Sequence, residues 1–362
     1  MRYVDEFRNG KFAKKLVEEI KNVSKKKIKL MEVCGTHTVA IFKYGLRGVM
    51  PENITLLSGP GCPVCVTANE MIDKAIWLVK QRSVILATFG DMVKVPGSSS
   101  SLSQEKSQGH DVRIVYSTMD ALKIAQDNPA KKVIFFAIGF ETTSPTIAAS
   151  ILEAKRLKLK NYYILAAHKL IPPAMKALLD TKELGLNGFI CPGHVSTIIG
   201  AKPYEFIIED YGIPCVITGF EPLDILQAIL MLVKQIEDNR PKVEIQYRRA
   251  VKYKGNPSAL RMLYEVFEEA DSNWRGIGVI PNSGLRLRRK YRDFDAENIF
   301  EIKQEKTRYV PGCLCGEVLR GVRIPTECKY FGKLCTPENP VGACMVSIEG
   351  ACSAYYKYRG KA

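Results

Sequence analysis

The stretch KKVIFFAIGFETTSPTIA, residues 131–148, joins a strand-like pattern directly to a helix-like one. Six apolar residues follow the two lysines, and a continuous apolar run is typical of a strand buried on both faces of a parallel sheet. Gly-Phe-Glu comes next, and a proline then stands near the first turn of an amphipathic segment. The same order recurs in ITGFEPLDILQA, residues 217–228. The sequence therefore predicts an α/β fold built on repeated strand-to-helix units.

Further apolar runs of strand length alternate with amphipathic segments of helical length from residue 27 to about residue 240. This alternation is typical of α/β layers with right-handed crossovers. The predicted strands are residues 27–33, 53–58, 83–89, 111–117, 131–138, 162–167, 188–191 and 214–218, and the clearest helices are 68–81, 118–128 and 222–238.

The two Gly-Phe-Glu units favour two sheets over one large sheet. We place the boundary near residues 125–130, so that residues 1–128 and 129–240 form two Rossmann-like parallel-sheet α/β domains facing a cleft. Past residue 240 the alternation fades, and six of the eleven cysteines fall between residues 313 and 352. Residues 241–362 are therefore expected to form a third, cysteine-rich domain.

Composition indicates the cellular compartment and the kind of partner. The first thirty residues lack the apolar core of a signal peptide, and no segment reaches the roughly 18 apolar residues of a membrane span. We expect a cytoplasmic protein that does not enter a membrane. Eleven cysteines in that reducing compartment point to metal binding or reversible thiol chemistry. The net charge is +15, but RLRRKYR is the one dense basic cluster, so a general surface bias or docking of an acidic protein partner is favoured over nucleic-acid binding.

Thiol, imidazole and carboxylate side chains gather where the predicted strands end. Ligands bind outside the carboxyl ends of strands in open α/β sheets. Each of these residues has a simpler explanation, such as a hydrogen-bonded core histidine or a carboxylate at a helix start. Together they predict a shared functional cleft. The residues are Cys34, His37, Cys62, Cys65, Glu141, His168 and His194.

The segment CGTHT, residues 34–38, directly follows the first predicted strand. A cysteine at the start of a helix faces unpaired backbone N–H groups, which should lower the pKa of its thiol. His37 stands one helical turn later and is expected to hydrogen-bond the Cys34 thiolate. This pair suits a nucleophile or a soft ligand for a low-valent metal. A Cys–His hydrolase is disfavoured because no Asn or Asp is placed to orient the imidazole.

The segment GPGCPVC, residues 59–65, follows the second predicted strand. A zinc ribbon would need a second Cys-x-x-Cys pair, which the chain lacks. At a strand-to-helix junction Cys62 and Cys65 also suit thiol–disulfide exchange. We interpret them as a redox or transient ligation pair.

The carboxy-terminal cysteines are irregularly spaced, and no gap matches the tight spacing of bacterial or plant-type ferredoxins. Four thiolates can still bind a [4Fe–4S] cluster if loops bring them together, which would leave a spare pair. Zinc held by four of the thiolates is the alternative. The six residues are Cys313, Cys315, Cys328, Cys335, Cys344 and Cys352.

Taken together, these motifs closely resemble the HypD family of [NiFe]-hydrogenase maturation factors. The matching elements are CGTHT, GPGCPVC, GFETT, PGHVS and the tail CTPENPVGACMVSIEGACSAYYKY, which run in order from residue 34 to residue 358. Any one of them is weakly specific, whereas five in sequence are highly specific. No cysteine or histidine of these motifs departs from the family pattern.

The resemblance implies a scaffold, monomeric when alone, that pairs with the small chaperone HypC to carry the iron of the hydrogenase active site. Two cyanides, delivered by HypE as a thiocyanate, and one carbon monoxide are installed on that transient iron. By motif, Cys34 is the iron ligand and Cys62 with Cys65 is the redox pair beside it. His37, Glu141 and His194 line the cleft.

The resemblance also implies a [4Fe–4S] cluster beside a thiol pair, similar to ferredoxin–thioredoxin reductase. On that pattern the cluster ligands are Cys313, Cys328, Cys335 and Cys352, and the redox pair is Cys315 with Cys344. Cys313 and Cys315 could exchange roles, and so could Cys344 and Cys352.

Three other functions are alternatives on the sequence alone. An iron–sulfur-dependent thiol–disulfide oxidoreductase acting on a protein substrate would use Cys62 and Cys65 but give Cys34 and His37 no distinct task. An RNA-modifying iron–sulfur protein would use the positive charge. A scaffold with structural zinc would use the carboxy-terminal cysteines alone.

Overall fold

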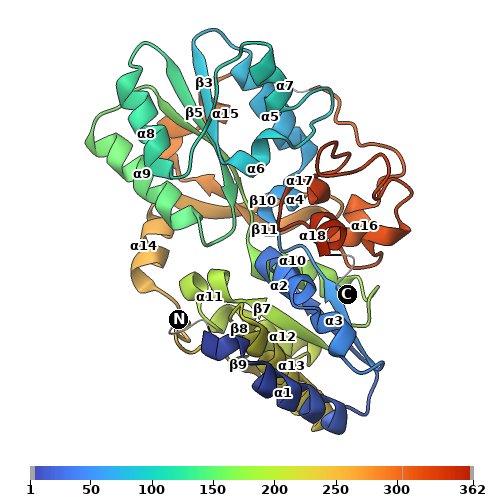
Figure 1. Ribbon diagram of the computed structural model, residues 1–362. Helices are drawn as coiled ribbons and strands as arrows, with labels where there is room; N and C mark the ends of the chain where they lie inside the picture. The colour runs from blue at the N-terminus through green and yellow to red at the C-terminus, as the bar shows by residue number, and fades with distance from the viewer. Residues whose placement is uncertain (1–4, 304, 359–362) are drawn as a thin grey trace.

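The computed structural model describes residues 5–303 and 305–358. Two parallel sheets form two lobes, and the carboxy-terminal segment lies beside the junction between them (Figure 1). The five-stranded sheet has the order β2-β1-β7-β8-β9 and the four-stranded sheet has the order β4-β3-β5-β6. The strands are β1 (Ile28–Glu32), β2 (Ile54–Ser58), β3 (Val84–Thr88), β4 (Val112–Ile114), β5 (Lys132–Gly139), β6 (Tyr162–His168), β7 (Gly188–Pro192), β8 (Cys215–Thr218) and β9 (Val243–Ile245).

All eight predicted strands are present, and both sheets are parallel throughout. The predicted α/β class with two Rossmann-like sheets is confirmed, and each sheet contains one Gly-Phe-Glu unit, after β5 and after β8. β5 is buried at every position but its first, as its apolar run requires.

The strands do not divide at residue 128. β1 and β2 pair with β7, β8 and β9 from the other side of that boundary, and β3 and β4 pair with β5 and β6. The chain therefore leaves the first sheet after β2, completes the second sheet, and returns at β7. Parallel strands need a long crossover in any case, and that crossover can contain a whole second sheet.

The helices cover the faces of the two sheets. Beside the five-stranded sheet lie η1 (Asp5–Arg8), α1 (Gly10–Val23), α2 (Gly35–Lys43), α3 (Leu46–Val49), α11 (Gly193–Ile199), η2 (Lys202–Tyr204), α12 (Glu205–Tyr211) and α13 (Pro222–Glu237). Beside the four-stranded sheet lie α5 (Asn69–Val79), α6 (Gly90–Val93), α7 (Leu102–Ser107), α8 (Thr118–Asp127), α9 (Ser144–Arg156), α14 (Pro257–Val266), η3 (Arg289–Phe294) and α15 (Ala296–Ile299), and α4 (Pro63–Val66) and α10 (Ile171–Asp180) lie near the junction.

Residues after 240 do not form one separate domain. β9 completes the five-stranded sheet, and the antiparallel hairpin of β10 (Phe267–Trp274) and β11 (Gly278–Leu287) packs its apolar face into the core of the four-stranded lobe. Period-two alternation in this hairpin is broken by a register shift between Ala270 and Ser272, so the sequence showed no clear strand pattern there.

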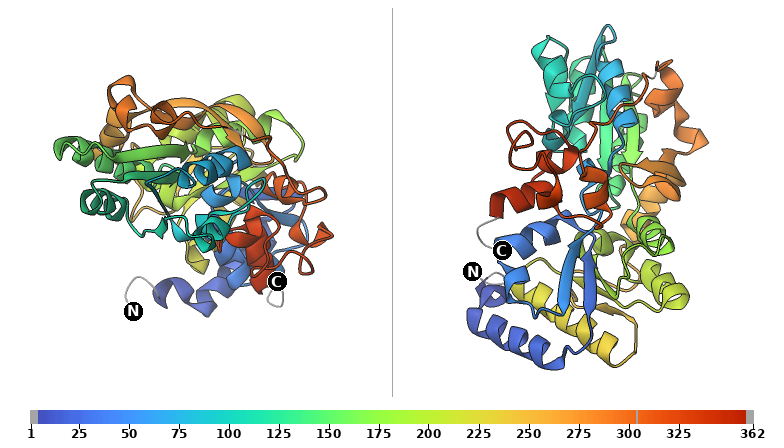
Figure 2. Two further views of the ribbon diagram at one scale, coloured as in Figure 1. Left: turned by 90° about the horizontal axis from the view of Figure 1, so that it is seen from above. Right: turned by 90° about the vertical axis from the view of Figure 1, so that its right-hand side faces the viewer.

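The cysteine-rich end lies beside the junction of the two lobes, as the right-hand view of Figure 2 shows. Its elements are α16 (Cys315–Leu319), η4 (Pro325–Glu327), α17 (Ala343–Val346) and α18 (Ala351–Tyr358). Cys315 and Cys344 belong to the same apolar core as Cys62 and Cys65, so this end is packed onto the α/β body. Of the helices in the described part of the chain, none combines the length and hydropathy that crossing a bilayer requires.

Candidate functional site

Two turns at the carboxyl ends of neighbouring strands touch each other. β1 and β2 pair in parallel with Glu32 beside Ser58, so the turns that follow them leave the sheet side by side. The N–H of Gly35 donates to the carbonyl oxygen of Gly61 at 2.8 Å. A Cβ atom on Gly61 would lie 2.2 Å from the backbone nitrogen of Cys34. Only glycine permits this approach, which places Cys34 against the Cys62–Cys65 turn.

Cys34 is the residue that precedes α2, and its sulfur faces the backbone N–H groups of Thr36 and His37. The predicted low pKa was wrong. Burial and the negative charge of Glu349 raise the pKa of the Cys34 thiol to about 12, against the smaller effect of the two N–H groups. A sequence pattern shows the helix start but cannot show that a carboxylate far along the chain faces it.

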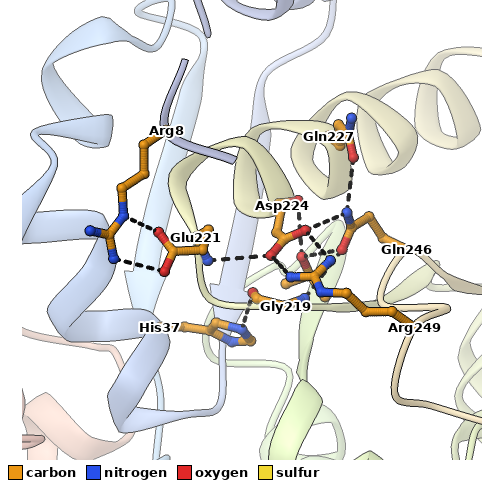
Figure 3. Close-up of polar contacts among 9 residues, drawn as sticks. Arg8, His37, Gly219, Glu221, Asp224, Gln227, Gln246 and Arg249 are labelled. Carbon is orange, nitrogen blue, oxygen red and sulfur yellow. Dashed lines mark hydrogen bonds and ion pairs between the residues drawn. The ribbon is translucent and has the colours of Figure 1, made fainter. Parts of the chain in front are cut away.

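His37 is fully buried, and its ring does not bond the Cys34 sulfur as predicted. Nε2 instead lies 2.9 Å from the carbonyl oxygen of Gly219, at the end of β8 (Figure 3). Burial lowers the pKa of His37 to about 4, so the ring is neutral at pH 7. A neutral ring whose Nε2 donates to this carbonyl leaves Nδ1 as an acceptor, and Nδ1 has no partner among the described residues.

Phe220 joins two of the predicted histidines. Its ring stacks on His37 with centroids 4.8 Å apart and on His194 with centroids 3.9 Å apart. His194 stands at the start of α11, and burial of part of its ring lowers its pKa. Phe220 was not predicted as a site residue, although it is the phenylalanine of the second Gly-Phe-Glu unit.

A buried polar network fixes the turn that holds His37 (Figure 3). Asp224 is fully buried and accepts two hydrogen bonds from the guanidinium of Arg249. Gln246 donates to Asp224 at 2.8 Å and accepts from the N–H of Gly219 at 3.2 Å. At the surface, Arg8 pairs with Glu221. These contacts explain why residues 219–221 hold one conformation.

Cys62 and Cys65 lie at the start of α4, both buried. The N–H of Cys65 points at the Cys62 sulfur, 3.2 Å away. Burial raises the pKa of Cys65, but interactions with Cys344 and Cys62 and the positive charge of Arg275 outweigh it and lower the pKa to about 5. Burial, and the proton it shares with Cys65, raise the pKa of Cys62. The turn therefore contains one thiolate and one thiol.

The carboxy-terminal segment brings further thiols to this turn. The sulfurs of Cys315 and Cys344 lie 3.0 Å apart. The Cys65 sulfur lies 3.8 Å from the carbonyl oxygen of Ala343, the neighbour of Cys344. Cys344 also interacts through its thiol with Cys65 and Cys352. A row of sulfurs thus runs from Cys62 to Cys315 without leaving the core.

The other four carboxy-terminal cysteines are close neighbours of one another. The charges of Cys328 and Cys352 raise the pKa of both Cys313 and Cys335, after burial. All six carboxy-terminal thiols line one small cavity together with Tyr330, Phe331 and Met345. Within residues 5–303 and 305–358, no three His, Cys, Asp or Glu side chains converge as a site for a single metal ion.

Comparison with known proteins shows the family to which the chain belongs. A family profile described as "HypD: Hydrogenase formation hypA family" matches residues 11–359. The chain belongs to the HypD family. It is 48% identical to the hydrogenase maturation factor HypD2 of Bradyrhizobium diazoefficiens over 99% of this chain and 97% of that protein. It is 46% identical to the hydrogenase maturation factor HypD of Escherichia coli K12 over 99% of this chain and 98% of that protein.

Two predicted residues of this HypD-family chain lie apart from the thiol row. Glu141 accepts from the N–H of Ile171 at 3.0 Å, at the start of α10, and burial raises its pKa to about 7. His168 is buried edge-on against Phe267, with centroids 5.1 Å apart, and burial lowers its pKa to about 3. Among the described contacts none joins either residue to Cys34, so the shared cleft that includes Glu141 and His168 stays a prediction.

Proposed function

We propose that this chain takes part in [NiFe]-hydrogenase maturation by holding the iron on which the cyanide and carbon monoxide ligands are assembled. HypC is the partner that shares the iron, and HypE is the donor of cyanide. The single observation that carries the proposal is the contact of the Cys34 turn with the Cys62–Cys65 turn through Gly61. It places a soft thiol ligand beside a pair of thiols that can supply electrons.

Cys34 is the iron ligand in this proposal. Its raised pKa keeps the thiol protonated until iron displaces the proton, and the sulfur then becomes a thiolate that tolerates strong-field ligands. His37 stays neutral at pH 7 and holds α2 to the Gly219 turn. In this proposal His37 and His194, which both stack on the Phe220 ring, orient the groups that lie beside Cys34.

Release of cyanide from a thiocyanate requires two electrons. The thiocyanate R–SCN takes up two electrons and one proton and gives the thiol R–SH and cyanide. Cys62 and Cys65 supply both electrons when they form a disulfide, and because Cys65 is already a thiolate the pair loses one proton, which balances the proton that the thiocyanate takes up. The Cys315–Cys344 pair then returns the Cys62–Cys65 disulfide to thiols by exchange along the row of sulfurs.

The residues also fit a [4Fe–4S] cluster. Four thiols surround one cavity with apolar walls, which suits a cluster held by thiolates. Cys313, Cys328, Cys335 and Cys352 would hold the cluster, which when bound supplies single electrons to the neighbouring pair. Cys315 and Cys344 remain the exchange pair because their sulfurs already lie 3.0 Å apart.

Infrared absorption of the chain purified anaerobically with HypC tests the proposal. We expect cyanide and carbonyl stretching bands in the unaltered protein and their loss in Cys34→Ala. Cys191→Ala is the matched control, because Cys191 is a buried thiol inside β7 and outside the row. Bands absent from all three samples, with iron and HypC present, would contradict iron carriage.

In that case a thiol–disulfide oxidoreductase is the better function. The close sulfur pair of Cys315 and Cys344 beside Cys65 favours it as the second candidate. Reduction of a protein disulfide that persists unchanged in Cys34→Ala, together with absent infrared bands, would establish it.

A further inference from the structure

Arg275 extends from the turn between β10 and β11 to the segment just after Cys65. Its backbone N–H donates to the carbonyl oxygen of Val66 at 2.9 Å, and its Nε donates to the carbonyl oxygen of Thr67 at 3.0 Å. Its Nη1 donates to the side-chain oxygen of Asn69. The guanidinium is therefore held in one place by the chain that leaves the Cys62–Cys65 turn.

This guanidinium is buried without a carboxylate. Arg275 is only 6% exposed, and its Nη2 has no hydrogen-bond partner among the described residues. Among the ion pairs of the described residues none includes Arg275. A buried charge is costly unless an opposite charge lies close to it. The structure thus requires an anion near Arg275 that is not Asp or Glu.

The neighbouring sulfurs are the candidates for that anion. Gly276 packs so tightly against Gly316, next to Cys315, that a Cβ atom on Gly276 would lie 2.1 Å from the Gly316 Cα. Arg275 and Cys315 line the same cavity, and the charge of Arg275 acts on Cys65 from the other side. The guanidinium charge therefore acts on both Cys65 and Cys315.

We propose that Arg275 holds Cys65 as a thiolate and thereby controls exchange between the Cys62–Cys65 and Cys315–Cys344 pairs. This inference rests on the proposed redox task of the two pairs. Arg275 acts through the sulfurs and the turn, so it is a positioning residue of the exchange. Arg275 lies outside the motifs that carry the family resemblance.

The other charged and titratable groups that face Cys65 act differently. Cys62 comes from its own helix, and Cys344 comes from α17. Asp91 of α6 and Glu349, which follows α17, place negative charge near Cys65 and favour the protonated thiol. Arg275 is the cation among the groups that act on Cys65, and it opposes both carboxylates.

The exchange balances as two displacements. The Cys344 thiol passes its proton to the Cys315 thiolate, 3.0 Å away, and attacks the Cys65 sulfur of a Cys62–Cys65 disulfide, so the Cys344–Cys65 bond forms and Cys62 leaves as a thiolate. Cys62 then takes the proton from Cys315. The Cys315 thiolate attacks Cys344, the Cys315–Cys344 disulfide forms, and Cys65 leaves with the electron pair. Arg275 stabilises that leaving thiolate, and a better leaving thiolate speeds exchange.

Proton uptake measures whether Cys65 ends as a thiolate. The anaerobically purified protein is equilibrated in dithiothreitol buffers of defined ratio between pH 6.5 and 8.5 and quenched in acid. It is then unfolded, alkylated and analysed by peptide mass spectrometry. After correction for the buffer, reduction that yields one thiol and one thiolate changes the equilibrium constant about tenfold per pH unit, and two thiols change it about a hundredfold.

We expect uptake of one proton in the unaltered protein and in Arg275→Lys, which keeps the charge. Arg275→Gln should take up two protons and shift the pair more than about tenfold toward disulfide at pH 7.5. Arg308→Gln is the control, because Arg308 lines the same cavity but is exposed. If Arg275→Gln does not fold, Arg275→Met retains the unbranched stem and replaces it.

Two results would overturn the inference: uptake of two protons by the unaltered protein, or uptake of one proton by a folded variant without the charge. Neither depends on iron. Loss of the infrared bands from the complex with HypC would instead contradict the proposed function, so the two failures are distinguishable.

Discussion

The turn that carries Cys34 and the turn that carries Cys62 and Cys65 follow neighbouring parallel strands, and each begins a helix. All three sulfurs are buried, yet the pKa of Cys34 is raised to about 12 while that of Cys65 is lowered to about 5. Backbone N–H groups at a helix start are common to both turns, so they do not decide the difference.

Burial raises the pKa of both thiols, and it is outweighed only at Cys65, first by hydrogen bonds with Cys344 and Cys62 and then by the charge of Arg275. Glu349 and Glu32 face Cys34 and favour its protonated form, whereas Arg275 and neighbouring thiols face Cys65 and favour its thiolate. The two turns therefore suit two tasks. Cys34 suits a ligand whose proton leaves when metal arrives, and Cys65 suits exchange chemistry that needs a thiolate at once.

The largest effect is expected from separating the turns. Gly61→Ala places a Cβ atom within 2.2–2.6 Å of the backbone of Cys34, which cannot move without distorting β1 or α2. We expect the free energy of unfolding in urea to fall by more than about 3 kcal/mol. Gly90→Ala is the control, because its Cβ atom meets nothing closer than 3.6 Å at an exposed helix start. It should be neutral or slightly stabilising.

Equal losses of unfolding free energy in Gly61→Ala and Gly90→Ala would mean that the contact between the two turns does not stabilise the fold. The infrared and exchange assays then show which task depends on it. We expect Gly61→Ala to weaken both, because it moves Cys34 and the Cys62–Cys65 turn together.

A smaller effect is expected from the carboxyl beneath Cys34. Glu32 accepts from the Thr38 hydroxyl at 2.7 Å, and burial raises its pKa from 4.5 to about 7. The folded state therefore binds more protons than the unfolded state between these values. The contribution of Glu32 to the free energy of unfolding is complete below pH 4.5 and falls by about 3 kcal/mol as the pH rises through 7. Glu32→Gln should remove this decline, as measured by urea unfolding at pH 4.5 to 8.

Glu141→Gln is the matched comparison for Glu32→Gln. Burial also raises the pKa of Glu141 to about 7, but Glu141 lies at α10, away from Cys34. Both variants should flatten the pH dependence of stability by a similar amount. Only Glu32→Gln should change the pKa of Cys34, and an equal change in both would show that the effect on Cys34 is not local.

The sequence predicted the local elements much better than their partners. The apolar run of residues 131–138 sufficed to place β5, because burial on both faces of a sheet needs such a run. It could not show that β1 pairs with β7, since strand pairing depends on packing across more than 150 residues. For the same reason the boundary at residue 128 failed.

The candidate site shows the same limit. Cys34, Cys62 and Cys65 were found because strand ends of a parallel sheet meet at one edge. Phe220, Glu349 and Arg275 were missed because their importance lies in contacts made after folding. The pKa of Cys34 was predicted in the wrong direction because the helix start was visible in the sequence and Glu349 was not.

Removing the charge of Glu349 should reduce the difference in pKa between Cys34 and Cys65. Glu349→Gln keeps an oxygen to accept from the Thr36 hydroxyl, which lies 2.7 Å from the carboxylate. The pKa of Cys34 should fall below 12, with about tenfold more thiolate at a given pH. The measurement is thiolate absorbance of the metal-free protein against pH, with Glu349→Gln/Cys34→Ala subtracted. An unchanged titration would assign the raised pKa to burial alone.

The smallest effect is expected from Thr36→Val, which removes the hydrogen bond to Glu349 but keeps the charge. The loss of one partly buried hydrogen bond should lower the free energy of unfolding by about 1 kcal/mol, as read from urea unfolding. The pKa of Cys34 should stay raised, because Glu349 remains beside it. Thr36→Val and Glu349→Gln thus separate the contact from the charge. If Thr36→Val also lowered the pKa of Cys34, the hydrogen bond would act by holding Glu349 close to the sulfur, and position as well as charge would distinguish the two turns.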